Sequence, residues 1–155
     1  AAMMNILPDW YLDIFEFVNS KIKEEKKAHD LIELGYSAEF NDEDNAYNQV
    51  LFQNSNFSVA LTDEFMRAVE TDGNYTLKGV KDNITKEIKA RELFGLICES
   101  AWFCGDPGVF FIDTVNKYNT CAESGSINSS NPCGEFLFLD NSACNLATIN
   151  LMKYR

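Results

Sequence analysis

The stretch ARELFGLICESAWFCGDPGVFFIDTV, residues 90–115, carries the pattern that decides the fold class. Apolar residues recur at helical spacing through Ala90–Phe103, which predicts an amphipathic helix. Gly105-Asp106-Pro107-Gly108 then breaks the helix. The apolar segment Val109–Val115 follows and predicts a buried strand. A helix, a tight break and a buried strand in succession are typical of α/β proteins.

The same alternation is expected upstream of this stretch. A helix is predicted to begin at Pro8-Asp9 and to run toward Leu34, with Gly35 as its C-terminal cap. Further elements are expected before residue 90. They are a loop at Phe40–Tyr47, a strand at Val50–Leu61, a short helix that is capped by Thr62 and buries Phe65, Met66 and Val69, and an exposed hairpin of Tyr75–Leu77 and Ile84–Ile88 around Gly79 and Asp82-Asn83.

Downstream, Ser124–Ser130 is small and polar and is expected to be a loop, whereas Phe136–Leu139 and Ala147–Leu151 are strand-like. No repeat or linker divides the chain, so residues 1–155 are expected to belong to one α/β domain. The first residues carry no cap or start pattern, and the last ones follow directly on an apolar stretch. Both ends are therefore expected to be truncated.

Composition excludes several classes of function. The chain has 155 residues, with 13 Lys and Arg against 24 Asp and Glu, a formal net charge of −11. Such an acidic chain is not expected to bind nucleic acid or an anionic membrane. The longest apolar runs are too short to span a bilayer, and no signal peptide is seen. Five cysteines are too few for a disulfide scaffold, which favours the reducing cytoplasm.

Asn131-Pro132-Cys133-Gly134-Glu135 is the stretch with the most chemical content. Pro132 and Gly134 disfavour a helix, so the segment is expected to be extended or looped. An extended chain would place Asn131, Cys133 and Glu135 on one side. An amide can hold a hydroxyl group, a carboxylate can take its proton, and a thiol can transfer a hydrogen atom. Spacing alone favours a plainer interpretation, with a buried cysteine, a solvated glutamate and an asparagine in a turn.

The other candidates for chemistry are weaker. Cys144 follows Cys133 by 11 positions, and a hairpin-like return could bring the thiols together, although a core cysteine is the favoured interpretation. No metal site is expected, because there is no CxxC pair and His29 lies among charged residues. Cys98 and Cys104 are expected in the core, and Cys121 stays unassigned.

Asn131–Glu135, followed by Ala-Cys-Asn-Leu-Ala-Thr-Ile-Asn-Leu at residues 143–151, resembles the catalytic subunit of ribonucleotide reductases. Further segments resemble the adenosylcobalamin-dependent (class II) branch of that family, and the resemblance covers essentially the whole chain. These segments are Ala1–Leu7, Asp13–Phe17, Phe52–Asn56, Thr62–Met66 and Gly105–Gly108.

This resemblance implies a fold and a set of roles. The fold is a ten-stranded α/β barrel with an inner finger loop that carries the NPCGE motif, and this chain resembles a central slice of it. Cys133 would become a thiyl radical and abstract the 3′-hydrogen of a ribonucleotide, and Glu135 would take the proton of the 3′-hydroxyl. Asn131 would hold the ribose hydroxyls, and Cys144 would be one of two reducing thiols. The substrate-binding residues would be Asn131, Pro132, Cys133, Gly134 and Glu135.

The resemblance also implies partners and missing parts. The complete enzyme would use adenosylcobalamin, a ribonucleoside diphosphate substrate, a deoxynucleotide effector and a thioredoxin-like reductant. The partner of Cys144 would lie upstream of Ala1, so the isolated chain is expected to be inactive without the remaining barrel segments or a complementary chain.

Two alternatives stay open from the sequence. One is a class I enzyme piece with a separate metal-radical subunit. The other is a non-catalytic split-barrel docking module, which exposed strand edges would favour. The joint presence of Asn131, Cys133, Glu135 and Cys144 argues against such a degenerate module.

Overall fold

A three-stranded parallel sheet lies at the centre of the computed structural model, which describes residues 2–39, 41–81 and 83–154. Its strand order is β1 (Met3–Pro8), β2 (Ser55–Leu61) and β5 (Gly108–Phe111). Val59 of the central strand pairs with Leu7 on one side and with Val109 on the other. Because the strands are parallel, their amino ends meet at one edge of the sheet.

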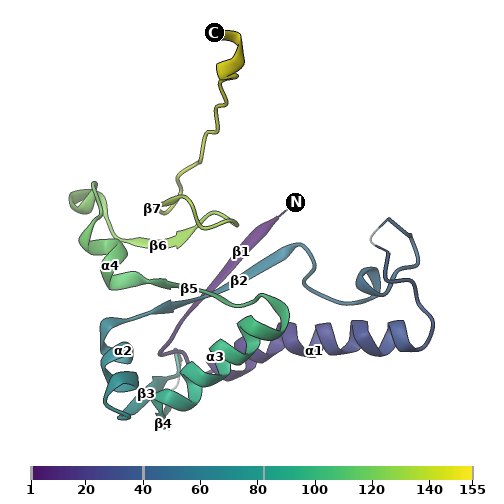
Figure 1. Ribbon diagram of the computed structural model, residues 1–155. Coiled ribbons are helices and arrows are strands. Elements are labelled where there is room, and N and C mark those ends of the chain that lie inside the picture. The colour runs from purple at the N-terminus through teal and green to yellow at the C-terminus, as the bar shows by residue number, and fades with distance from the viewer. Residues whose placement is uncertain (1, 40, 82, 155) are drawn as a thin grey trace.

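Helices cover one face of this sheet, and a hairpin lies across the other (Figure 1). On the helical face, α1 (Ile14–Glu33) and α3 (Ala90–Cys104) pack against each other. The hairpin consists of β6 (Ile127–Ser130) and β7 (Leu137–Leu139), which pair antiparallel. The remaining elements are η1 (Ala46–Gln49), α2 (Asp63–Glu70), β3 (Asn74–Lys78), β4 (Thr85–Lys89), α4 (Ile112–Lys117), η2 (Ala122–Ser124) and η3 (Leu151–Tyr154).

The main apolar core lies between β2, α1, α2, α3 and the β3–β4 hairpin. Val59 and Leu61 of β2 point into it, as predicted, because successive side chains of a strand leave opposite faces. Phe57, which was predicted to lie with them, is buried but is not part of this core. The edge of the Phe65 ring meets Tyr75 with the ring centres 5.0 Å apart. The buried residues of this core are Ile14, Val18, Val59, Leu61, Phe65, Tyr75, Leu77, Ile88, Ala90, Leu93 and Ile97.

Capping residues in the sequence predicted the start of α2 and the end of α3 correctly. The Thr62 hydroxyl accepts a hydrogen bond from the Phe65 N–H at 3.1 Å, which caps α2 as predicted. The helix α3 ends at Gly105, whose φ of 78° is the left-handed conformation that glycine adopts without strain. The β3–β4 hairpin is also confirmed, although it is not fully exposed: Tyr75 and Leu77 are buried in the core. Its expected turn residue Asp82 lies outside the described residues, as do Ala1 and Phe40.

The first helix does not begin where the sequence pattern predicted. Pro8 ends β1, and α1 starts only at Ile14. The strand β1 was not predicted at all, since its extended backbone is stabilised by hydrogen bonds to β2, about fifty residues later in the chain. The Asp9 side chain is fully buried and accepts hydrogen bonds from Thr62 and Tyr75 instead of beginning a helix.

Several predicted strands and loops are also corrected. The strand expected at Val50–Leu61 begins only at Ser55. The expected buried strand Val109–Val115 ends at Phe111, and α4 follows. Val109 and Phe111 are 43% and 46% exposed, because β5 lies at the sheet edge.

The C-terminal third differs most from the sequence pattern. The loop expected at Ser124–Ser130 contains β6, whereas the short strand expected at Phe136–Leu139 is confirmed as β7. Ala147–Leu151 forms no strand. Residues 142–150 have no regular structure, and with η3 they form an arm that extends away from the body (Figure 1).

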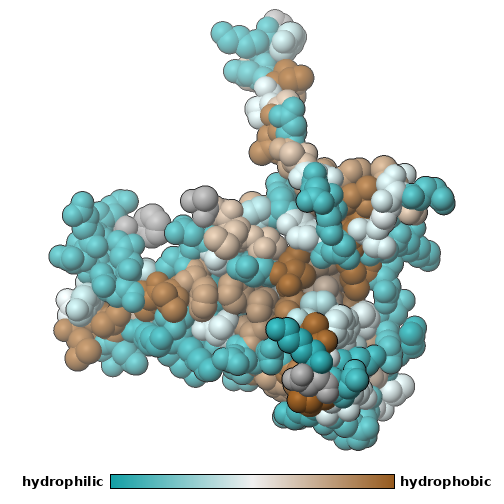
Figure 2. All heavy atoms as spheres, turned by 180° about the vertical axis from the view of Figure 1, so that it is seen from behind, coloured by the Kyte–Doolittle hydropathy of each residue, from teal (hydrophilic) through white to brown (hydrophobic). Residues whose placement is uncertain are grey.

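The mixed α/β class is confirmed, and the sheet is open. Within the described ranges, three parallel strands form an unclosed sheet, which fits part of a larger barrel. Seen from behind, apolar atoms form a band across the middle of the body between hydrophilic surfaces (Figure 2). Among the described residues, no helix combines the length and the apolar character needed to cross a bilayer.

Candidate active site

Residues 131–136, here called the cysteine loop, connect β6 to β7. Asn131 closes the loop, because its N–H donates to the Phe136 carbonyl at 3.2 Å and its Oδ1 accepts from the Phe136 N–H at 2.9 Å. The Gly134 N–H donates to the Asn131 carbonyl at 3.0 Å, and Gly134 has a φ of 80°. The segment is therefore a closed turn. Of the two conformations expected from the sequence, the looped one is found, and the extended one, with three side chains on one side, is not.

The turn exposes the two groups with the most reactive chemistry. The Cys133 thiol is free and exposed, so the interpretation of Cys133 as a buried small residue is wrong. Glu135 is exposed as well, whereas Asn131 and Pro132 are partly buried. The amide Nδ2 of Asn131 has no hydrogen-bond partner among the described residues, so it is available to a hydroxyl group of a ligand.

A cavity of about 350 Å³, here called the Cys133 cavity, lies between the cysteine loop and the amino ends of the parallel strands. Cys133, Pro132 and Gly134 contribute from the loop. The sheet contributes residues from all three strands and from the turn before β5. Those residues are Met4, Asn56, Phe57, Ser58, Gly105, Asp106, Gly108, Val109 and Phe110.

Asn56 connects the two walls of this cavity. Its Nδ2 donates to the Pro132 carbonyl oxygen at 2.5 Å, across 76 residues of sequence. Asn56 and Ser58 lie on the face of β2 that is turned toward the β6–β7 hairpin, opposite the face that carries Phe57 and Val59.

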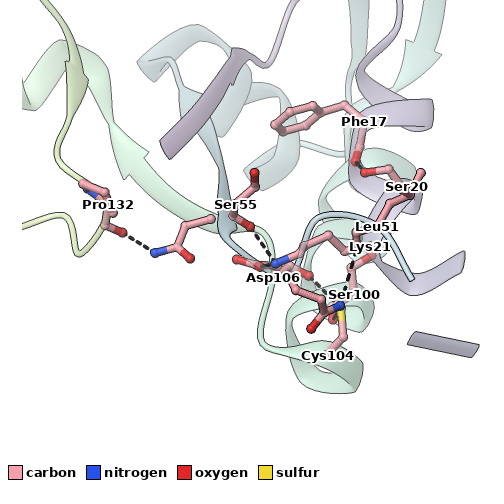
Figure 3. A network of polar contacts seen from close by, with 11 residues as sticks. Phe17, Ser20, Lys21, Leu51, Ser55, Ser100, Cys104, Asp106 and Pro132 are labelled. Atoms are coloured by element: carbon pink, nitrogen blue, oxygen red, sulfur yellow. Dashed lines mark hydrogen bonds and ion pairs between the residues drawn. The ribbon is translucent and has the colours of Figure 1, made fainter. Parts of the chain in front are cut away.

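Lys21 of α1 fixes the sheet side of the cavity. Its Nζ donates to the Ser55 carbonyl at 2.7 Å and to Asp106 Oδ2 at 2.5 Å (Figure 3). The Lys21 and Asp106 side chains are both only 18% exposed. The same ammonium group lies 5.7 Å from the centre of the Phe57 ring. One charged group therefore joins α1, the start of β2 and the turn that leads into β5.

Gly108 allows the strands to approach closely at this point. A Cβ added at Gly108 would lie 2.9 Å from Ser58 Oγ, closer than carbon and oxygen atoms tolerate. Ser58 and Gly108 are register partners on β2 and β5. A larger residue at either position would therefore push β5 away from the sheet and reshape the cavity.

Cys144 borders a different cavity. This second space, of about 490 Å³, lies against the other side of the hairpin. Its lining includes Asn131 and Cys144 but not Cys133. No strand follows β7 among the described residues, so the expected hairpin-like return of Cys144 toward Cys133 does not form. Glu135 lines neither cavity.

The remaining cysteines and the single histidine do not form a site. Cys98 is exposed on α3, so its expected place in the core is wrong. Cys104 is partly buried, and its Sγ lies 3.4 Å from both the Ser100 and Asp106 carbonyl oxygens. Cys121 is partly buried. His29 is more than half exposed and lies 3.3 Å from Glu25. Within the described ranges, no three His, Cys, Asp or Glu residues are grouped to hold a metal.

Sequence reasoning assigned no role to Asn56 or Ser58. A signal was present, because SNFSVAL places polar residues at alternate positions of an otherwise apolar strand and asparagine is uncommon in strands. The alternation indicates that one face of β2 meets something other than the apolar core. It does not indicate which segment of the chain that is.

Comparison with known proteins finds matches that cover nearly the whole chain. The family model described as "Ribonucleotide reductase, barrel domain" matches residues 1–155. A Rhodopirellula baltica protein named vitamin B12-dependent ribonucleotide reductase is 52% identical over 99% of this chain and 15% of its own length. A protein of the same name from Streptomyces coelicolor is 43% identical, over 99% and 16%. A Thermoplasma acidophilum vitamin B12-dependent ribonucleoside-diphosphate reductase is 36% identical, over 99% and 17%.

Proposed function

The chain belongs to the ribonucleotide reductase barrel-domain family, and on this premise we propose that it supplies the radical cysteine of an enzyme that reduces ribonucleotides to 2′-deoxyribonucleotides. The chain spans about 15% to 17% of the length of the three relatives compared above. The activity is therefore proposed for the complete protein that contains this segment, with a ribonucleoside diphosphate as substrate. The isolated segment should be inactive.

The observation that carries this proposal is the exposed Cys133 thiol at the edge of a cavity, in a loop whose sequence is Asn-Pro-Cys-Gly-Glu. As a thiyl radical, Cys133 takes the hydrogen atom from C3′ of the ribose and becomes a thiol. Glu135 takes the proton of the 3′-hydroxyl, which eases the loss of the 2′-hydroxyl as water. The free Nδ2 of Asn131 donates to a ribose hydroxyl and holds the sugar in place.

Cys144 is proposed as one of the two thiols that supply the reducing equivalents. Two thiols give two electrons and two protons, the 2′-hydroxyl leaves as water, and a disulfide forms. Cys133 returns its hydrogen atom to C3′ and becomes the radical again, so it is not consumed. The second thiol belongs to another part of the complete protein.

We further propose adenosylcobalamin as the cofactor, which when bound supplies the initiating radical chemistry. The relatives named above are vitamin B12-dependent by name. What this segment must offer such a group is an accessible sulfur, and the exposed Cys133 fits that requirement. The described residues hold no cluster of metal-ligating side chains, so no residue of this segment is assigned to hold the cobalt.

The remaining parts of the proposal concern the complete protein. Residues 1–155 form part of one ten-stranded catalytic barrel, and the cysteine loop is its inner finger loop. The open edges of the sheet pair with the remaining barrel segments or with a complementary chain. A deoxynucleotide effector and a thioredoxin-like reductant complete the system. Its place is the cytoplasm, where thiols stay reduced.

The test uses the complete protein with a ribonucleoside diphosphate, a deoxynucleotide effector, a dithiol and adenosylcobalamin. Deoxyribonucleotide formation should require the cobalamin and should disappear in Cys133→Ser. Cys98→Ser is the matched control, because Cys98 is also exposed but lies on α3, away from both cavities, and this variant should keep its activity. Activity that survives in Cys133→Ser would refute the assignment.

The two alternatives from the sequence correspond to other outcomes. Activity that needs a separate metal-radical subunit instead of cobalamin would indicate a class I enzyme. If neither cobalamin nor a metal-radical subunit gives turnover, the result would indicate a non-catalytic docking module. The names of the relatives favour neither alternative.

A further inference from the structure

Asn56 is the residue through which the parallel sheet holds the cysteine loop. Its Nδ2 donates to the Pro132 carbonyl at 2.5 Å. Among the residues that the structure describes, no other hydrogen bond joins the loop of residues 131–136 to the β1–β2–β5 sheet. The other hydrogen bonds of this loop are formed within it or with the adjoining Ser130. They give the loop its shape but do not fix its position on the sheet.

The base from which Asn56 acts is rigid. Asn56 is the second residue of β2 and pairs with Met4 of β1, and β2 is buried over most of its length. From Ser58 onward β2 also pairs with β5. Its backbone neighbour Ser55 is 8% exposed, and the Ser55 carbonyl accepts a hydrogen bond from Lys21 at 2.7 Å. Phe57, on the other side, is 6% exposed and stacks on Phe17 with the ring centres 4.8 Å apart. The Asn56 side chain therefore extends from a fixed point.

The atom that Asn56 holds is one peptide bond away from the thiol-bearing residue. The Pro132 carbonyl belongs to the planar peptide unit that also contains the Cys133 nitrogen and Cα. A hydrogen bond to that oxygen restrains the orientation of the peptide plane. The orientation of this plane in turn sets the direction in which the Cys133 side chain points. Gly134 follows at once with a φ of 80°, a position where the chain turns sharply.

We propose that Asn56 is a positioning residue for Cys133, which sets where the sulfur lies over the Cys133 cavity; the consequence for turnover rests on the function proposed above. Transfer of a hydrogen atom depends steeply on the distance between sulfur and carbon, so a loop that is free to shift on the sheet lowers the rate of the chemical step. Asn56 does not contact the sugar in this proposal. Its effect should fall on kcat more than on KM.

The test compares Asn56→Asp with Asn54→Asp in the complete protein. Both substitutions add one carboxylate of the same size. Asn56→Asp loses the donor and places a charge against the Pro132 carbonyl oxygen, whereas Asn54 is an exposed residue that lines neither the Cys133 cavity nor the Cys144 cavity. The first readout, taken without cofactor, is the rate at which iodoacetamide alkylates Cys133 relative to Cys98, resolved by peptide mass spectrometry.

In Asn56→Asp the ratio of Cys133 to Cys98 alkylation should change roughly fivefold, the factor that the free energy of one hydrogen bond corresponds to. The kcat for ribonucleotide reduction should fall on the order of 100-fold, with KM little changed. Asn54→Asp should match the wild type in both measurements. Asn56→Gln, which retains an amide donor on a longer side chain, should recover part of kcat.

An unchanged alkylation ratio in Asn56→Asp overturns the proposal, and so does an equal effect in Asn54→Asp. The proposal is also overturned if the loss of kcat in Asn56→Asp is no larger than the loss of folded protein, which thermal unfolding measures. If Asn56→Asp does not fold, Asn56→Ala removes the donor without adding a charge and is judged by the same criteria. If the wild type lacks reductase activity, the proposed function fails, and the alkylation ratio still decides whether Asn56 positions Cys133.

Discussion

The Tyr75 hydroxyl donates a 2.9 Å hydrogen bond to Asp9 Oδ1 across 66 residues of sequence, inside the protein. Asp9 Oδ2 accepts two more hydrogen bonds, from the Thr62 N–H at 2.6 Å and from the Thr62 hydroxyl at 2.9 Å. The Asp9 carboxylate thus joins the end of β1, the start of α2 and the strand β3. Its partners satisfy it fully, which makes its complete burial tolerable.

Removal of this carboxylate should destabilise the protein more than removal of any one partner. Asp9→Ala leaves buried donors on Thr62 and Tyr75 unpaired, and we expect a loss of about 3 kcal/mol in the free energy of unfolding. Tyr75→Phe removes a single hydrogen bond and should cost about 1 kcal/mol. Asp13→Ala is the control, because Asp13 is exposed and its side chain caps nothing. Urea unfolding curves in which Tyr75→Phe loses more unfolding free energy than Asp9→Ala would contradict this prediction.

Two carboxylates should respond to pH in opposite directions. Burial raises the pKa of Asp9 above its usual 3.8, although its hydrogen bonds offset part of this effect. The native state then binds the proton more tightly than the unfolded state. The stability that comes from this pKa difference is therefore fully present below pH 3.8 and is lost as the pH rises through the raised pKa, whereas the hydrogen bonds from Thr62 and Tyr75 remain.

The contribution of Glu24 to stability depends on pH in the opposite direction. The Leu51 N–H donates to Glu24 at 2.9 Å, and this bond, with a contribution from Lys27, lowers the pKa of Glu24 below its usual 4.5. Its stabilising contribution is therefore present above pH 4.5 and is lost as the pH falls through the lowered pKa. The stability difference between wild type and Glu24→Gln should shrink on acidification. A difference that grows instead would refute the assignment.

Because β2 and β5 approach closely at Gly108, a second substitution at Ser58 should restore the stability that a larger residue at Gly108 removes. Gly108→Ala places a methyl group 2.9 Å from Ser58 Oγ and should cost about 1–3 kcal/mol of stability. The double variant Gly108→Ala with Ser58→Ala should recover most of this loss, because the hydroxyl is gone. Gly95→Ala is the matched control, since its new methyl group meets nothing within 4 Å, and in the helix α3 it should stabilise by about 0.5–1 kcal/mol. Equal losses in the single and double variants would contradict the steric explanation.

Lys21 and Asp106 should be energetically coupled. Lys21→Met leaves Asp106 and the Ser55 carbonyl without their shared donor, and we expect a loss of about 1–3 kcal/mol. A double-mutant cycle with Asp106→Asn should give a coupling energy of about 0.5–3 kcal/mol. Exposed Lys23→Met should change stability by less than about 0.5 kcal/mol. Strict additivity of Lys21→Met and Asp106→Asn would show that the pair contributes nothing.

Elements held by local signals were predictable, and those held by distant partners were not. The helix α3 and the cap of α2 follow from residues within a few positions of one another. The strand β1 escaped prediction because its pairing partner is β2. The exposure of Val109 and Phe111 also could not be foreseen, because an apolar run does not reveal that its strand lies at the edge of a sheet.

The candidate site divides in the same way. By itself, the sequence determined the mixed α/β class, the resemblance to ribonucleotide reductases and the thiol, carboxylate and amide of residues 131–135, because helix spacing, caps and residue chemistry are local properties. Only the tertiary structure decided that these residues form a closed turn, that Asn56 holds it across 76 residues of sequence, and that Cys133 and Cys144 border different cavities. Contacts over such separations depend on how the sheet and the hairpin pack, which no local pattern encodes.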